Sequence, residues 1–116
     1  MGDKITIYQK PTCSKCRAAL AILDESGKPF DSINYYDDRL TVESLRELVR
    51  KLGIPVKHLL RADEPLANGT ESADDEELLR LMAANPDLIQ RPIVVRGDSA
   101  VLGRPPENIK KLLTEP

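Results

Sequence analysis

The chain has 116 residues, and its 17 basic and 19 acidic side chains leave a formal net charge of -2 at pH 7. This length fits a single domain spanning residues 1–116, and a hydrophobic content of 41% supplies a core without cross-links. The balanced charge and an aromatic content of 3% argue against direct binding to nucleic acid. No apolar run reaches the roughly 20 residues that cross a bilayer, and the N-terminal residues lack the apolar segment of a secretory signal. We therefore expect a cytoplasmic protein without membrane contact.

The first half of the chain alternates between strand and helix patterns. Strands are predicted where β-branched residues alternate with polar ones, and helices where apolar residues recur at helical spacing. Gly27 ends the first helix, while Thr41 is the expected N-cap of the second and Gly53 its end. The predicted strand, helix, strand and helix cover residues 4–8, 14–26, 30–36 and 42–52.

The second half begins with less regular sequence. Residues 55–72 predict a short helix and a loop, and the acidic run 74–77 suits the start of a helix that ends before Asn85-Pro86. A β-hairpin follows at residues 92–95 and 100–102, because Gly97-Asp98 between them is a typical turn sequence. A final helix is predicted over residues 106–113.

The complete order is βαβ, then three helices, then ββα. A Cys-x-x-Cys motif follows the first strand, and an α/β core of this order with that motif is typical of a thioredoxin-like fold. The helices between about residues 42 and 84 are then an insertion between the two halves of the sheet.

The two cysteines of the chain, Cys13 and Cys16, stand at i and i+3 where the first strand turns into a helix. Unpaired backbone N–H groups at a helix start favour a thiolate, as do nearby cations such as Lys10. Cys13 is nearer the helix end and is therefore the predicted nucleophile. A structural zinc ion needs four ligands, but His58 is the other soft donor, so we expect no metal in a single chain. Inert, buried cysteines are the alternative.

Three arginines are candidate anion ligands. Arg91 and Pro92 precede the third strand, where thioredoxin-like sheets often hold a cis proline facing the start of the first helix. That placement would put Arg91 against Cys13. Arg61 and Arg104 both lie beside apolar or loop residues, where arginine is usually an ordinary ion-pairing residue. If the three converge, their guanidinium groups suit a tetrahedral oxyanion.

Five segments carry a resemblance to a known family: Ile5-Thr6-Ile7-Tyr8, residues 11–17, Leu59-Leu60-Arg61, residues 90–95 and residues 103–107. The chain resembles the glutaredoxin-coupled arsenate reductase (ArsC) family of the ArsC/Spx superfamily over nearly its whole length. The resemblance implies a thioredoxin-like fold with a helical insertion and an arsenate reductase of arsenic detoxification. It also implies that Cys13 attacks arsenate and that Arg61, Arg91 and Arg104 bind the oxyanion.

The chain departs from the family pattern at two positions. A histidine of the family, thought to lower the pKa of the nucleophile, is replaced by Gln9, and Lys10 or the helix dipole would have to take its place. The family's usual serine is replaced by Cys16, which adds a resolving thiol and predicts a redox-active disulfide. A Cys-x-x-Cys pair is also typical of Spx-like regulators that bind RNA polymerase. Gly103-Arg104-Pro105 favours the reductase over that regulator, and a general thiol-disulfide oxidoreductase is a further alternative.

The resemblance also implies what the protein binds. We expect arsenate or a similar oxyanion as substrate, no bound cofactor, and glutathione or a thioredoxin or glutaredoxin as reductant. We further expect a monomer. Cys16 is expected to attack the sulfur of the Cys13–arsenic adduct and release arsenite, because a neighbouring thiol has a high effective concentration. The alternative is that Cys16 merely fills the place of the serine.

Overall fold

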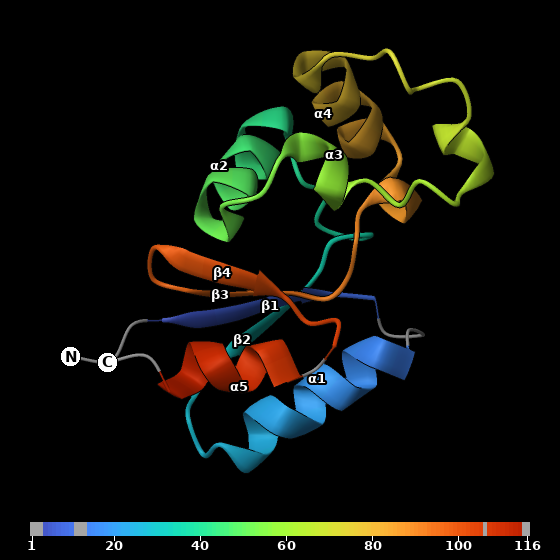
Figure 1. Cartoon of the computed structure of the whole chain (residues 1–116). Coiled ribbons are helices and arrows are strands. Elements are labelled where there is room, and N and C mark those ends of the chain that lie inside the picture. The colour runs from blue at the N-terminus through green and yellow to red at the C-terminus, as the bar shows by residue number, and fades with distance from the viewer. Residues whose placement is uncertain (1–3, 11–13, 106, 115–116) are drawn as a thin grey trace. The chain divides into compact units, whose positions relative to one another are not determined.

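The computed structural model describes residues 4–10, 14–105 and 107–114, in two compact units. The first unit is formed by the two ends of the chain, up to Asp38 and from Arg91 onward. The second unit, Arg39–Gln90, is the middle of the chain. Each unit is described by itself below, and Figure 1 labels their helices and strands.

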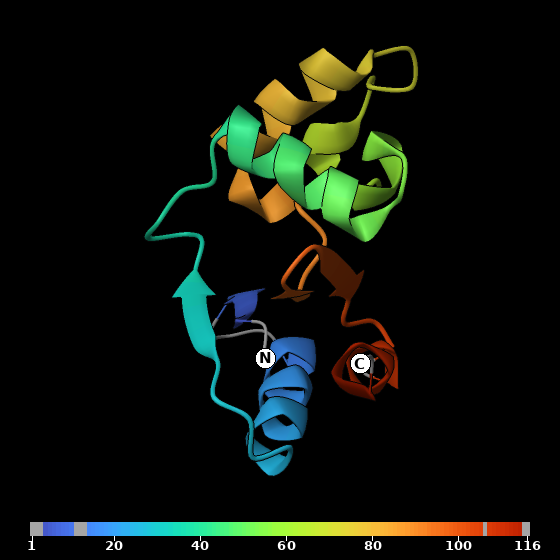
Figure 2. The same cartoon turned by 90° about the vertical axis from the view of Figure 1, so that its left-hand side faces the viewer.

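The first unit contains a four-stranded sheet with the strand order β2-β1-β3-β4. Strand β1 is parallel to β2, and the pairs β1–β3 and β3–β4 are antiparallel. Two helices belong to this unit and lie side by side on one face of the sheet (Figures 1 and 2). The elements are β1 (Ile5–Gln9), α1 (Ser14–Glu25), β2 (Asp31–Asn34), β3 (Ile93–Arg96), β4 (Ser99–Leu102) and α5 (Glu107–Thr114).

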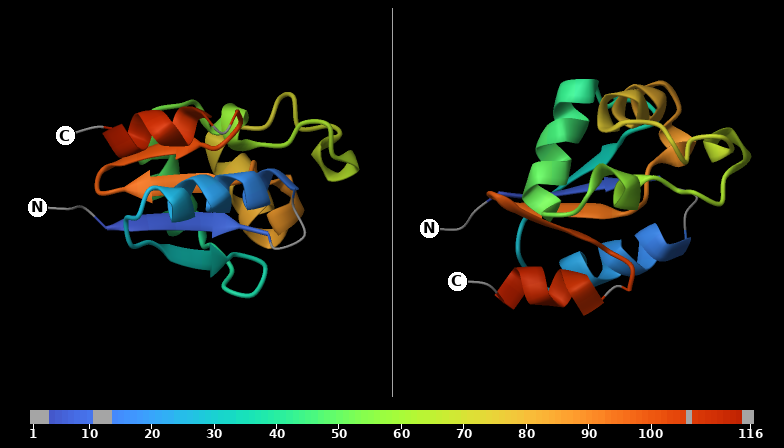
Figure 3. Two further views of the ribbon diagram at one scale, coloured as in Figure 1. Left: turned by 90° about the horizontal axis from the view of Figure 1, so that it is seen from below. Right: turned by 45° about the horizontal axis from the view of Figure 1, so that its top comes forward.

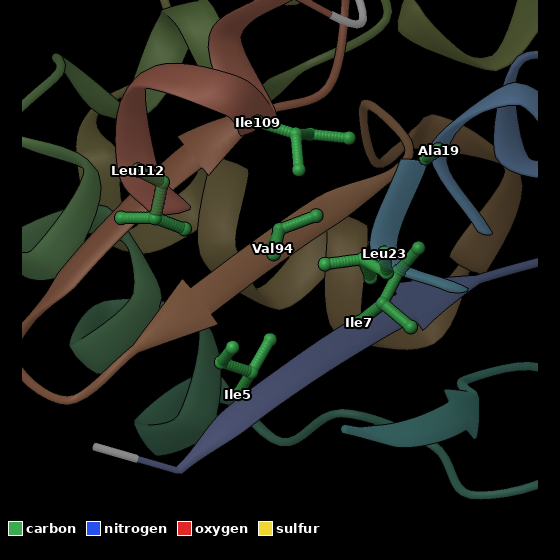
Figure 4. Close-up of a cluster of buried hydrophobic side chains, with 7 residues drawn as sticks. All are labelled: Ile5, Ile7, Ala19, Leu23, Val94, Ile109 and Leu112. Atoms are coloured by element: carbon green, nitrogen blue, oxygen red, sulfur yellow. The ribbon is translucent and has the colours of Figure 1, made fainter. Parts of the chain in front are cut away.

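The core of the first unit lies between that face of the sheet and the two helices. Alternate residues of β1 are buried, so Ile5, Ile7 and Gln9 share the helix-covered face. Helix α1 passes over β1 (Figure 3, left), and Figure 4 shows its side chains meeting those of β1, β3 and α5. The cluster consists of Ile5, Ile7, Ala19, Leu23, Val94, Ile109 and Leu112.

The second unit is helical, with α2 (Val42–Leu52), α3 (Val56–Leu59), η1 (Pro65–Ala67), α4 (Asp75–Ala84) and η2 (Pro86–Leu88). Helices α2 and α4 contact each other (Figure 2). On the surface of the pair, Arg46 of α2 binds Glu76 of α4, with Nη1 2.6 Å from Oε2. This hydrogen bond holds the pKa of Glu76 below its usual value. None of the helices in the described ranges combines the length and the apolarity needed to cross a bilayer.

The α/β class, the thioredoxin-like sheet and the element order are as predicted, and the predicted helices of the insertion fall inside the second unit. The second strand differs, because it ends at Asn34 and not at Tyr36. Asn34 Oδ1 accepts a hydrogen bond from the backbone N–H of Tyr36 at 3.0 Å, and this side-chain turn ends the strand. The 3-10 turns over Pro65–Ala67 and Pro86–Leu88 were not predicted.

Candidate functional site

The predicted nucleophile, Cys13, lies outside the described residues. Cys16 belongs to the first turn of α1, is 1% exposed and shares the buried face of that helix with Ala19 and Leu23. The first turn of α1 carries no acidic side chain. The start of α1 therefore holds a second sulfur inside the protein, where solvent does not reach it.

Gln9, which the resemblance matches to a histidine, is buried, with 8% of its surface exposed. Its Nε2 donates a hydrogen bond to Ser32 Oγ at 3.0 Å, so the amide ties the end of β1 to β2. Within the part of the chain that the structure describes, Gln9 Oε1 has no hydrogen-bond partner. A glutamine amide carries no titrating proton, so Gln9 cannot supply the positive charge of a protonated histidine.

Tyr36 brings two predicted site residues together at the end of β2. The ammonium group of Lys10 lies 4.8 Å from the centre of the Tyr36 ring. Arg91 Nη1 donates to the hydroxyl oxygen of Tyr36 at 3.4 Å. Because the ring face attracts one cation and the hydroxyl accepts from the other, Tyr36 holds both near the end of β2.

A hydrogen bond of Gly103 joins the backbone segment that carries Arg91 to the one that carries Arg104. Its backbone N–H donates to the carbonyl of Pro92 at 2.8 Å, and each arginine is one residue away from this hydrogen bond. The Arg91–Pro92 bond is cis, as predicted, and the Arg104–Pro105 bond is also cis. A Cβ atom at Gly103 would lie 2.7 Å from Pro92 Cγ and 3.1 Å from Ile109 Cδ1. Only glycine allows the chain after β4 to pass this close to Pro92.

Arg61 belongs to the second unit, directly after the short helix α3 and Leu60. Its Nη1 lies 3.1 Å from Glu64 Oε1 and donates to the carbonyl of Asp87 at 3.3 Å. Its backbone N–H donates to the carbonyl of Leu88 at 2.7 Å. The side chain is 17% exposed, so Arg61 is a positioned arginine and not a freely moving surface cation.

Sequence reasoning missed three residues that hold the predicted ones in place: Tyr36, Gly103 and Glu64. Tyr36 and Glu64 carry no motif, and their roles follow only from contacts in the folded unit. Gly103 had a signal, because it opens the Gly-Arg-Pro segment. His58 is exposed. In residues 4–10, 14–105 and 107–114, no cluster of three or more His, Cys, Asp or Glu side chains could hold a metal ion.

Comparisons with known proteins match the chain over nearly its full length. A model of the ArsC family matches residues 8–112. The arsenate reductase of Neisseria meningitidis serogroup A is 35% identical, over 95% of this chain and 98% of that protein. The arsenate reductase of Yersinia enterocolitica is 41% identical, over 98% of this chain and 84% of that protein. The solved structure of an arsenate reductase from Vibrio cholerae is similar with a TM-score of 0.90 at 36% identity, over 96% of this chain and 98% of that one.

Gly103→Ala should destabilise the first unit by about 1–3 kcal/mol, because the added methyl group cannot fit beside Pro92 and Ile109 unless the Pro92 ring shifts. Urea unfolding followed by circular dichroism measures the change. Ser99→Thr adds a methyl group at an exposed position of β4 and should stay within about 0.5 kcal/mol of the parent protein. Equal stability of Gly103→Ala and the parent would show that the contact with Pro92 is not a constraint.

Proposed function

Since the chain belongs to the ArsC family, we propose that it is an oxidoreductase that reduces arsenate to arsenite through the thiol of Cys13. The observation that carries this proposal is the near full-length similarity to proteins named arsenate reductase, together with a cysteine at position 13 and arginines at positions 61, 91 and 104. The proposed substrate is arsenate or a similar tetrahedral oxyanion. The proposed reductant is a thioredoxin, or glutathione with a glutaredoxin.

In the first proposed step, the thiolate of Cys13 attacks arsenic, an S–As bond forms and one arsenate oxygen leaves as water after protonation. The thiolate is favoured because Cys13 directly precedes α1, whose N-terminal N–H groups and lack of acidic residues in the first turn stabilise negative charge. Lys10 adds a positive charge nearby in sequence. Because Gln9 is neutral, the positive potential that favours the thiolate comes from Lys10 and the start of the helix.

The proposed role of Arg61, Arg91 and Arg104 is to bind the oxyanion and offset its charge while the S–As bond forms. Arg91 is suited to this role because Tyr36 accepts one of its N–H groups at 3.4 Å and restrains the guanidinium. Arg104 follows Gly103, whose hydrogen bond to Pro92 ties this segment to the one that carries Arg91. Tyr36 also supports Lys10 through its ring.

In the second proposed step, the Cys16 thiolate attacks the sulfur of Cys13. The S–As bond breaks with its electron pair going to arsenic, so As(V) becomes As(III) and arsenite leaves, while the two thiols become a disulfide. A dithiol reductant then returns the two electrons by thiol-disulfide exchange. The burial of Cys16 keeps external thiols and oxidants from its sulfur, which favours an internal partner.

The first test of this function is turnover. The purified protein should reduce arsenate with thioredoxin or with glutathione plus glutaredoxin, and Cys13→Ser should lower the rate on the order of a thousandfold or more. Iodoacetamide should modify Cys13 before Cys16, with a Cys13 pKa below the ordinary value of about 8.5.

A different outcome would point to another class of protein. Absence of turnover with every donor would contradict the reductase, and the Cys-x-x-Cys pair would then favour a redox-responsive regulator. Binding to RNA polymerase subunits would be the next measurement. Faster alkylation of Cys16 would contradict the assignment of the nucleophile.

Cys16→Ser tests the second step. The internal route predicts that thioredoxin-supported turnover is lost and that an arsenic adduct or mixed disulfide accumulates on Cys13, as seen by mass spectrometry. Cys16→Ala is the matched variant, because it also lacks sulfur but adds no buried hydroxyl. Full activity of both variants, with no internal disulfide in the parent protein after one turnover, would make Cys16 a small packing residue.

Tyr36→Phe should raise the KM for arsenate about threefold to tenfold with kcat changed less, because Arg91 loses an acceptor whose hydrogen bond contributes about 0.5–1.5 kcal/mol. Tyr36→Leu should raise KM further, since Lys10 also loses the ring beneath it. Tyr8→Phe removes a hydroxyl from β1 and serves as the control. If Tyr36→Phe and Tyr8→Phe have the same KM as the parent, Tyr36 does not position the cations.

A further inference from the structure

Arg61 already has an anionic partner in the structure, the carboxylate of Glu64. Glu64 Oε1 lies 3.1 Å from Arg61 Nη1, and the two side chains are 30% and 17% exposed. This pair is therefore more shielded than the ion pair of Arg46 with Glu76, whose side chains are 48% and 46% exposed. A shielded pair is screened less by water and salt.

Local backbone structure holds Glu64 against Arg61. The backbone N–H of Glu64 donates to the carbonyl of Arg61 at 3.1 Å, which closes a turn between the two residues. Glu64 is also the N-cap position of η1, and the next residue is Pro65, whose ring fixes the backbone. Since the partners are three residues apart in one turn, the pair forms with little loss of chain entropy.

Arg61 also donates hydrogen bonds to neutral backbone carbonyls. Its Nη1 donates to the carbonyl of Asp87, and its backbone N–H donates to that of Leu88, so both fix the position of Arg61 without offsetting its charge. Glu64 therefore supplies a full negative charge at the distance of a hydrogen bond from the guanidinium. A second anion brought to the same guanidinium would be repelled by that carboxylate.

We propose that Glu64 is an internal counter-ion that competes with the oxyanion for Arg61 and thereby sets the affinity of the protein for its substrate. This inference rests on the proposed function, which makes Arg61 an oxyanion ligand. When the oxyanion binds, it either displaces the Glu64 carboxylate from Nη1 or shares the guanidinium with it. Both cost free energy, so Glu64 weakens the binding of every tetrahedral dianion that uses Arg61.

Glu64→Gln removes the charge at nearly constant shape, and inorganic phosphate is an unreactive tetrahedral probe for it. The Kd for phosphate, measured by isothermal titration calorimetry, should fall about threefold to tenfold relative to the parent protein. The KM for arsenate should fall by a similar factor with little change in kcat. Glu64→Asp, with a carboxylate one methylene shorter, should give an intermediate Kd and carries the same test should Glu64→Gln unfold.

Asp63→Asn is the matched control, because Asp63 is an exposed acid in the same loop and its removal changes the net charge equally. Its phosphate Kd should change less than about twofold. In an Arg61→Ala background, Glu64→Gln should have no effect on Kd, since the cation for which the carboxylate competes is gone. An equal effect of Asp63→Asn, or an effect of Glu64→Gln that survives Arg61→Ala, would overturn the proposal.

Two outcomes separate this inference from the proposed function. If the parent protein binds phosphate and Glu64→Gln binds it more tightly but neither reduces arsenate, the reductase fails and the counter-ion stands. If Glu64→Gln keeps its thermal stability but binds phosphate no better than the parent, or more weakly, then Glu64 orients Arg61 and does not compete for it. The counter-ion proposal is then wrong, whatever the turnover.

Discussion

The close approach of Gly103 to Pro92 is the constraint on which the arrangement of the first unit depends. The chain leaves β4 at Gly103 and passes the residue that precedes β3, with a backbone hydrogen bond of 2.8 Å between them. A side chain at position 103 would strike both Pro92 and Ile109, so the same contact also seats α5 on the sheet. Arg91 and Arg104 are therefore carried by two backbone segments that lie side by side, because each arginine is next to one of the hydrogen-bonded residues.

In each unit, the candidate cations have partners of different chemical kinds. Lys10 lies over the ring of Tyr36, and Arg91 donates to the Tyr36 hydroxyl. Arg61 contacts the carboxylate of Glu64 and the carbonyl of Asp87. A neutral partner orients a guanidinium and leaves its charge for a ligand, whereas a carboxylate neutralises it. Tyr36 therefore orients Lys10 and Arg91 in the first unit without neutralising them, while Glu64 offsets the charge of Arg61 in the second unit.

Local signals account for the part of the structure that was predicted well. The helix over residues 42–52 has the predicted ends because Thr41 Oγ1 accepts from the Ser44 N–H and Gly53 adopts the left-handed conformation that ends the helix. The second strand was predicted too long because the apolar and aromatic pattern continues through Tyr36. The side chain of Asn34 turns the backbone before that pattern ends.

The candidate site was predicted from motifs, and its supporting contacts were not. Tyr36 and Arg91 are 55 positions apart, and no local pattern in the sequence relates a tyrosine after one strand to an arginine before another. Glu64 is only three residues from Arg61, but a charged residue at that spacing is usually a solvated surface residue. Its role depends on the burial of Arg61, which is a property of the folded second unit.

Tyr36 also affects the optical spectroscopy of this protein. The chain has three tyrosines and no tryptophan, and two of the tyrosines are the adjacent pair Tyr35 and Tyr36, whose ring centres are 5.1 Å apart. The near-ultraviolet absorption band of the protein therefore comes mainly from its three phenol rings. One of them, Tyr36, contacts both Lys10 and Arg91. Tyr36 is therefore an intrinsic chromophore in contact with Lys10 and Arg91, and a change at either cation should alter the tyrosine spectrum.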